Sequence, residues 1–257
     1  MKDANQELAE AANAGDHAKI FDLLAGGADP RSQDSKALRA AAFNGQAECV
    51  RLLLPGSDPT SLNSAALRAA AYNGHEPCVR LLLPVSDAKA AESDALRGAA
   101  VNGHAACVLL LLRVSDAKAD ESAALRGAAT NGHAECVRLL LPVSDALAMG
   151  SAALMWAALN GHEECVRMLV GASGPLMGFN GLLDEVFERG RANMAAVLIE
   201  QEPRLLDGIN LPKCLAVALE NGHEDMAGFL SSIIDQRELA GVAQDAEACG
   251  GPRHARL

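Results

Sequence analysis

Five cysteines and four histidines recur at one constant interval, and both residue types can bind metals or act in catalysis. The cysteines are evenly spaced along the chain, at Cys49, Cys78, Cys107, Cys136 and Cys165. The histidines keep the same interval, at His75, His104, His133 and His162. Thiolate and imidazole are common zinc ligands, and paired cysteines can form disulfides. Either chemistry requires side chains from different repeats to converge.

Equal spacing keeps these side chains apart. Residues at the same place in successive packed units lie on the order of 10 Å from one another. A disulfide needs Cα atoms within about 7 Å, and zinc needs about four ligands at roughly 2.3 Å. Met194 and Met226 hold the equivalent positions near the C-terminal end, which favours packing over ligation. We therefore predict buried, unpaired thiols, no metal site and no cofactor.

The histidines are not predicted to be catalytic, because an active site is not copied four times along a chain. The sequence also contains no phosphate-binding loop, HExxH motif, nucleophile motif or paired CxxC. We predict that the protein is not an enzyme. The alternative is an enzyme whose site lies in the diverged segment 171–236.

Glycines mark the elements that position these residues. They recur at nearly constant steps, at Gly15, Gly45, Gly74, Gly103, Gly132, Gly161, Gly190 and Gly222. A fixed period of this length indicates a repeat protein, in which each unit buries its apolar face against its neighbours.

Each central unit predicts two helices. A serine opens the first helix and is expected to cap it, at Ser35, Ser64, Ser93, Ser122 and Ser151. An Asn-Gly pair ends that helix, because glycine adopts the left-handed conformation at little cost. The second helix carries an apolar stripe, as in Cys78, Val79, Leu82 and Leu83.

The repeat boundaries give the expected organisation of the chain. Residues 1–34 form an N-terminal capping repeat, and residues 35–179 form five repeats of equal length. Residues 180–236 form two diverged repeats at the C-terminal end. Residues 237–257 contain Gly250-Gly251-Pro252 and no apolar stripe, so a frayed or disordered tail is expected.

The repeated unit resembles the ankyrin repeat family. Residues Ala66-Leu67-Arg68-Ala69-Ala70-Ala71-Tyr72-Asn73-Gly74-His75 carry its T-P-L-H-x-A-A-x-x-G-H pattern, with Ala for Pro and Arg for His. The segment Leu23-Leu24-Ala25-Gly26-Gly27-Ala28-Asp29-Pro30 matches the family loop. The resemblance implies an all-α solenoid of helix-turn-helix repeats. The repeat here is shorter than the family's usual length of about 33 residues, which implies short or absent β-hairpin fingers. The resemblance also implies that the histidines brace the turns with hydrogen bonds between units.

Two further rows could bind a partner. The residue just before each repeated Asn-Gly pair differs from one repeat to the next. The resemblance places this residue on the concave groove. The candidates in this row are Phe43, Tyr72, Val101, Thr130 and Leu159, joined by Trp156 one turn earlier. Packing between neighbouring first helices is the alternative. The second row is Arg39, Arg68, Arg97 and Arg126. These arginines either satisfy carbonyls or an acidic residue of the adjacent loop, such as Asp34, Glu92 or Glu121, or grip an acidic peptide or phosphate.

The amino-acid composition limits the classes of partner that the protein is expected to bind. The formal net charge of −11 disfavours binding to nucleic acid, which needs clustered Lys and Arg. No stretch reaches the roughly 20 apolar residues of a membrane span, and Met1–Glu7 lacks an apolar signal core. We predict a cytoplasmic protein, with secretion lacking a cleaved signal left open. The predicted function is a monomeric, non-enzymatic module that binds a partner protein, plausible as a bacterial effector or immunity-type protein. A self-associating scaffold is the alternative.

Overall fold

The computed structural model describes residues 3–172 and 180–249, in which helices are joined by turns and loops and no strand occurs. This confirms an all-α solenoid without β-hairpin fingers. The chain divides into two compact units, Met1–Gly174 and Pro175–Leu257, and each is described by itself. The predicted boundary between residues 179 and 180 lies next to residues 173–179, which are outside the described part of the chain.

The first unit consists of helix pairs. The first helices of the pairs are α1 (Ala4–Ala14), α3 (Ser32–Phe43), α5 (Ser61–Tyr72), α7 (Ala90–Val101), α9 (Ala119–Thr130) and α11 (Ala148–Asn160). The second helices are α2 (His17–Ala25), α4 (Ala47–Leu53), α6 (Glu76–Leu82), α8 (Ala105–Leu111), α10 (Ala134–Leu140) and α12 (Glu163–Val170). A short 3-10 helix, η1 (Leu54–Gly56), follows α4.

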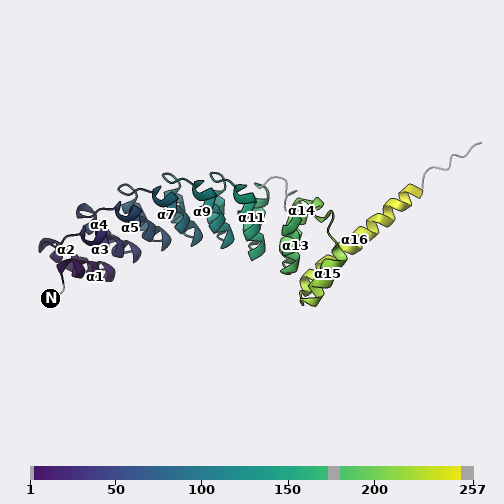
Figure 1. Ribbon diagram of the computed structural model, residues 1–257, viewed down its shortest axis with the longest axis horizontal. Helices are drawn as coiled ribbons and strands as arrows, with labels where there is room; N and C mark the ends of the chain where they lie inside the picture. Colours follow the sequence, from purple (N-terminus) through teal and green to yellow (C-terminus); the bar gives the residue numbers. More distant parts are fainter. Residues whose placement is uncertain (1–2, 173–179, 250–257) are drawn as a thin grey trace, which may run out of the picture. The chain divides into compact units, whose positions relative to one another are not determined.

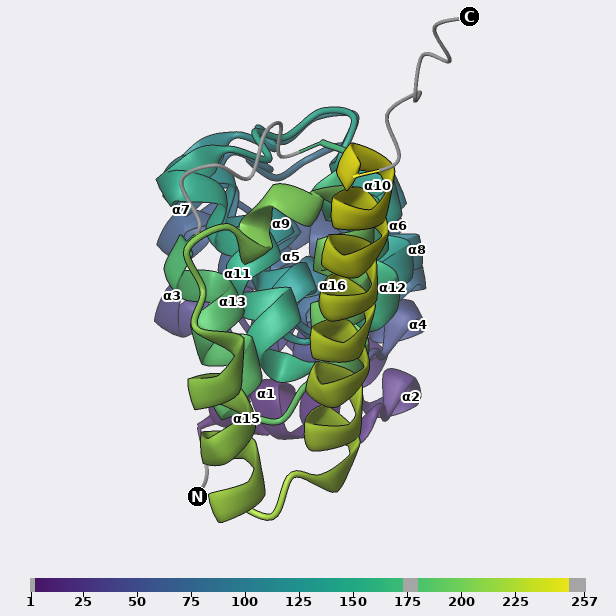
Figure 2. The same ribbon diagram turned by 90° about the vertical axis from the view of Figure 1, so that its right-hand side faces the viewer.

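The pairs stack in two layers. Each first helix packs on the first helix of the next pair, and each second helix packs on the next second helix. Figure 1 shows this succession from α1 to α11, and Figure 2 shows the layer of α3, α7 and α11 beside the layer of α4, α6 and α8. The side chain of any one position therefore forms a row along the stack.

The core repeats with the sequence. Its largest members are fully buried leucines at two positions per pair, including Leu38, Leu67, Leu96, Leu125 and Leu154 on first helices and Leu53, Leu82, Leu111, Leu140 and Leu169 on second helices. Alanine pairs such as Ala70 and Ala71 are also fully buried, and small side chains allow neighbouring helices to approach closely. The predicted apolar stripe of the second helices is confirmed at Cys78, Val79 and Leu82, which are buried, whereas Leu83 is half-buried.

A left-handed turn lies inside each of five first helices, directly after the first residue of the range given above. Its three residues have φ between 47° and 64°, and they are Gln33–Ser35, Leu62–Ser64, Ala91–Ser93, Asp120–Ser122 and Met149–Ser151. Such angles cost about 1–2 kcal/mol for each residue with a Cβ, so contacts with neighbouring groups must hold the turn.

The prediction that the serines cap their own helices is wrong. No side-chain hydrogen bond caps these helices, and Ser64 is instead the buried last residue of its left-handed turn. Its Oγ accepts a hydrogen bond from the backbone N–H of Asp87 in the next loop, at 2.9 Å. Ser35, Ser93 and Ser122 accept in the same way from Asp58, Asp116 and Asp145. The turn directs the hydroxyl toward the next repeat, because the backbone there is not helical.

The first repeat uses a different residue for the same contact. Asn5 occupies the serine position, and its Oδ1 accepts from the backbone N–H of Asp29 at 2.7 Å. The sequence equivalence of Asn5 with the repeat serines therefore corresponds to an equivalent bond.

The second unit contains α13 (Asn180–Glu188), α14 (Ala192–Gln201), η3 (Pro203–Leu206), α15 (Leu211–Glu220) and α16 (Glu224–Cys249). α13 packs on α14 and α15, and α15 packs on α16. The expected frayed tail is wrong for residues 237–249, since α16 continues through Cys249. Residues 238–249 are rich in Ala and Glu, which are strong helix formers. Residues 250–257 lie outside the described part of the chain.

Candidate functional site

A cavity opens on the first-helix layer of the first unit. It measures about 280 Å³ and lies between α3, α5 and α7. Its lining residues are Phe43, Ala65, Arg68, Ala69, Tyr72, Asn73, Asp94 and Gly98. Phe43 and Tyr72 come from the variable row that the sequence singled out.

The large side chains of this row are exposed. Phe43 is 54% exposed and Tyr72 is 55% exposed, and Trp156 near the other end of the row is 43% exposed. Val101 and Thr130 are half-buried. Contiguous exposed apolar side chains mark contact sites, and Tyr and Trp are enriched at the hot spots of such sites.

The expectation that Leu159 joins an exposed strip is wrong, because this residue is only 5% exposed. α11 buries a broader face than the preceding first helices. Ala152 and Leu159 are buried on it, whereas Ala65 and Tyr72 hold the same positions on α5 and are not. Leu159 therefore belongs to the packing of its helix.

Two residues of the variable row lie against a glycine of the following first helix. A Cβ on Gly98 would stand 3.5 Å from the Tyr72 ring, which is ordinary van der Waals contact. On the next pair, a Cβ on Gly127 would stand only 2.4 Å from Cγ2 of Val101. Gly127 thus allows Val101 to lie close against the following helix. Trp156 fills this glycine position on α11.

Three of the four arginines in the arginine row brace the left-handed turns. Arg39 donates to the carbonyl oxygens of Gln33 and Asp34, each at 3.1 Å. Arg68 donates to Leu62 at 3.3 Å and Arg126 donates to Asp120 at 2.9 Å, in both cases to the carbonyl of the first turn residue. These bonds support the interpretation that the arginines satisfy the adjacent loop.

Asp94 adds an ionic cluster at the edge of the cavity. Its Oδ2 lies 2.9 Å from Nη1 of Arg68, and its Oδ1 pairs with Arg97. The acidic partners expected from the sequence were Asp34, Glu92 and Glu121. Of these, Asp34 contributes its backbone carbonyl to Arg39, and the carboxylate that joins two arginines is Asp94.

The histidines bridge successive repeats. Nε2 of His75 lies 2.9 Å from the carbonyl oxygen of Phe43, and Nε2 of His104 lies 3.0 Å from that of Tyr72. His133 and His162 make the same contact with Val101 and Thr130. A carbonyl only accepts, so each Nε2 carries the proton and donates. These bonds confirm the predicted bracing role and fix the backbone beneath the exposed row.

The five repeat cysteines are buried and free, as predicted. Burial raises the pKa of the thiols of Cys78, Cys107, Cys136 and Cys165 to about 11. Burial is also the main cause of the raised pKa of Cys49. Thiols with raised pKa values are poor nucleophiles at neutral pH. Among the described residues, no group of three or more His, Cys, Asp or Glu could hold a metal ion.

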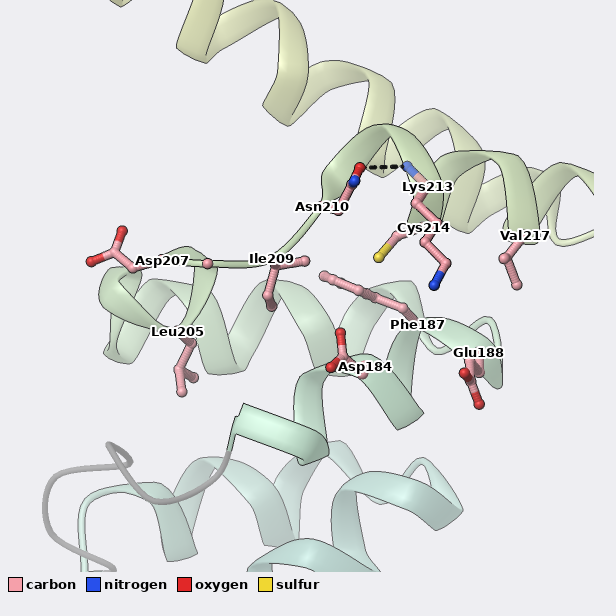
Figure 3. Close-up of a pocket in the computed structure, with 11 residues that line it drawn as sticks. Asp184, Phe187, Glu188, Leu205, Asp207, Ile209, Asn210, Lys213, Cys214 and Val217 are labelled. Carbon is pink, nitrogen blue, oxygen red and sulfur yellow. Dashed lines mark hydrogen bonds between the residues drawn. The ribbon is translucent and has the colours of Figure 1, made fainter.

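The second unit contains a larger cavity that the sequence did not predict. It measures about 430 Å³ and lies between α13, the loop after η3 and the start of α15. Figure 3 shows Phe187 and Ile209 at its centre, with Cys214 and Lys213 from α15 on one side and Asp184 from α13 on the other. The step from Gly190 to Gly222 is longer than any of the steps between the preceding glycines. This longer step was the signal in the sequence that the connection between these two repeats differs from the others.

Comparison with known proteins gives the class of the fold. The profile of the family described as "Ankyrin repeats (3 copies)" matches residues 8–94 and 96–176. The chain belongs to the ankyrin repeat family. The crystal structure of the human ASB11 ankyrin repeat domain is similar with a TM-score of 0.58 and 23% sequence identity, over 66% of this chain and 84% of that chain. This likeness shows the fold. No curated protein sequence matches the chain.

Ankyrin repeats are generally protein–protein interaction modules and typically scaffolds without enzymatic activity. Of the helices formed by residues 3–172 and 180–249, none is long and apolar enough to cross a membrane.

Proposed function

We propose that this protein is a non-enzymatic module that binds a partner protein through the aromatic groove, defined as Phe43, Tyr72, Val101, Thr130 and Trp156. The observation that carries the proposal is the pair Phe43 and Tyr72, which are more than half exposed on either side of one cavity. A merely solvated helix face would be polar at these positions. Aromatic side chains are frequent hot spots of protein interfaces.

The same geometry argues for a partner that contributes an apolar side chain. The cavity is walled by Phe43, Tyr72 and the alanines of α5, while Arg68, Asp94 and Arg97 form a charged edge. Because Asp94 already engages both arginines, the edge offers polar contacts without a large unpaired charge. We assign the arginine row to holding the turns, with the half-exposed Arg97 in reach of a partner.

An enzymatic role is less favoured. The segment 171–236 holds the larger cavity, and Cys214 is its only thiol. Burial and the nearby Asp184 raise the pKa of Cys214, which opposes its use as a nucleophile.

The amino-acid composition bears on the source of the protein. Arg outnumbers Lys by 16 to 6, and alanine is abundant, which favours a GC-rich bacterial source. We propose a cytoplasmic bacterial protein with an effector or immunity-type role.

Affinity capture from the source cell tests the groove. The bait proteins are the wild type, a Tyr72→Ala, Trp156→Ala variant, and an Arg80→Ala, Arg167→Ala control altered on second helices. Each groove substitution should weaken a partner by about 2 kcal/mol, while the melting temperature stays nearly unchanged because both side chains are exposed. A partner held equally by all three proteins would show that it binds elsewhere.

Self-association through the aromatic groove is the second candidate, since exposed apolar side chains also mark contacts between copies. Light scattering over a concentration series separates the two. A mass that rises with concentration in the wild type and not in the Tyr72→Ala, Trp156→Ala variant would favour the scaffold.

A further inference from the structure

The cavity of the second unit has the features of a binding site, and it is independent of the aromatic groove. Its volume of about 430 Å³ lies in the range of small-ligand pockets. Phe187 and Leu205 are almost completely buried and form apolar wall, together with the partly buried Ile209 and Val217. The walls therefore suit an aliphatic chain.

The charges around this cavity indicate which charge the end of a bound aliphatic chain should carry. Asp184 and Glu188 line the cavity from α13, at i and i+4 and so on one face of the helix. Neither carboxylate has a hydrogen-bond or ion-pair partner in the part of the chain that the structure describes. Two like charges at this spacing destabilise a helix.

Two neighbouring residues of α13 form an ion pair, in contrast to Asp184 and Glu188. Glu185 and Arg189, also at i and i+4, form an ion pair with Nη2 of Arg189 2.8 Å from Oε1 of Glu185. The helix thus neutralises the acid that faces away from the cavity and leaves two acids unneutralised beside it. Asp207, the third acid of the lining, lies 4.0 Å from Arg237, and Figure 3 shows its carboxylate directed away from Cys214 and Phe187.

Lys213 is the single basic residue of the lining. Asp184, Glu188 and Lys213 all act on the Cys214 thiol, the two acids raising its pKa and the lysine lowering it, although burial is the largest cause. All three charged residues line the same cavity, although Figure 3 shows the carboxylate of Glu188 apart from that of Asp184. Two negative charges against one positive leave this part of the lining acidic.

The repeat register shows that this acidity is local to the second unit. Asp184 stands one repeat after Met155 and two repeats after Arg126, in the position of the arginine row. Glu188 stands one repeat after Leu159, in the row of Phe43 and Tyr72. Positions that carry no acidic residue in the first unit are thus acidic here.

We propose that this cavity binds a lysine or arginine side chain presented by a partner polypeptide. The aliphatic stem lies against Phe187, Leu205 and Ile209, and the terminal cation lies beside the carboxylates of Asp184 and Glu188. The side chain of Lys213 competes with that cation, which keeps the affinity for a single residue low.

The test is NMR titration of the full-length protein with small model compounds. The probes are the N-acetyl methylamides of lysine and arginine, with that of norleucine as the equal-stem compound without a charge. The first two should shift the backbone amides of Asp184, Lys213 and Cys214 saturably, with dissociation constants on the order of 1 mM. Norleucine should bind about threefold to tenfold more weakly, as expected for loss of exposed ion pairs.

Variants make the test specific. Asp184→Asn with Glu188→Gln should weaken the lysine compound about threefold to tenfold. Glu200→Gln with Glu202→Gln changes the charge of the same unit equally, outside the cavity, and should have no such effect. Lys213→Met should strengthen binding, a gain that misfolding could not produce.

Several results would overturn the proposal. Equal binding of lysine and norleucine compounds would show that the cation is not recognised. Shifts confined to other residues, or none at about tenfold the expected dissociation constant, would show that the cavity is not the site. Butylammonium binding as tightly as the lysine compound would assign the cavity to free amines instead of a polypeptide.

Discussion

The imidazole of His133 lies directly against Gly103 of the preceding repeat. A Cβ built on Gly103 would stand 2.6 Å from Nδ1 of His133, closer than real Cβ contacts allow. Nε2 of the same ring lies 3.0 Å from the carbonyl oxygen of Val101. His133 therefore both packs against the turn of the preceding repeat and hydrogen-bonds to its backbone.

This relationship predicts the effect of Gly103→Ala. The residue has φ of +77°, so alanine is strained there and also collides with the His133 ring. We expect a loss of about 2 kcal/mol or more in the free energy of unfolding. Gly27→Ala is the control, because Gly27 has φ of +86° with nothing within 4 Å of its Cβ position. Urea unfolding of both variants measures the difference. Equal losses would mean that the histidine contact does not contribute.

Gly98 and Gly127 predict different outcomes of the same substitution at equivalent positions. Gly98→Ala should stabilise the first unit by up to about 1 kcal/mol, since alanine is the better helix former and its Cβ would meet Tyr72 at 3.5 Å. Gly127→Ala should be less stable than Gly98→Ala, because its Cβ would meet Cγ2 of Val101 at 2.4 Å and valine is stiff in a helix. Thermal unfolding followed by circular dichroism compares the two. The reverse order would show that Val101 moves freely.

Two leucines of α8 separate core from surface. Leu111 is fully buried and Leu109 is 52% exposed. Leu111→Ala should cost about 2–5 kcal/mol, whereas Leu109→Ala should stay within about 0.5 kcal/mol of the wild type. Urea midpoints with unchanged slopes provide the values. A large loss at Leu109 would indicate that its exposed face packs against something in solution.

The buried thiols predict a dependence of stability on pH. Below about pH 9 they hold their protons in both states. Between about pH 9 and 11 the unfolded chain releases protons that the folded Cys78, Cys107, Cys136 and Cys165 keep. The free energy of unfolding should therefore fall as pH rises through this range.

Lysine and tyrosine titrate in the same range, so the measurement needs a variant. A Cys107→Ala, Cys136→Ala protein should show a shallower fall of the urea midpoint with pH than the wild type. Mass spectrometry after brief treatment with a thiol reagent gives a second readout. The five repeat cysteines should react only after denaturation, and rapid native labelling of two or more would contradict their burial.

The sequence predicts most strongly where the same residue recurs in phase. The glycines, the histidine bridges and the buried cysteines were accessible in this way, because one physical role imposes one residue type on every repeat. Phe43 and Tyr72 were accessible for the opposite reason, since they vary within an otherwise repeated context. Their exposure agrees with that inference.

The left-handed turns escaped prediction because they leave almost no composition signal. Of the residues in these turns with positive φ, Gly150 is the one glycine, and Leu62 and Ala91 have no local preference for that conformation. The conformation is held by side-chain bonds to groups outside the three turn residues, such as the guanidinium of Arg126 to the Asp120 carbonyl and the N–H of Asp145 to Ser122. The serines were therefore assigned to the wrong partner. The cavity in the second unit escaped for a similar reason, because it is formed by helices α13 and α15 that are not adjacent in sequence.

The hydrogen bonds between repeats that the structure describes within residues 3–172 join each repeat to the adjacent one, as from Asp87 to Ser64 and from His104 to Tyr72. Under tension applied at the two ends, such a stack has no clamp that shares the load across its whole length. We expect single-molecule pulling to detach the repeats one after another, at low force and with steps of roughly one repeat's contour length, about 10 nm.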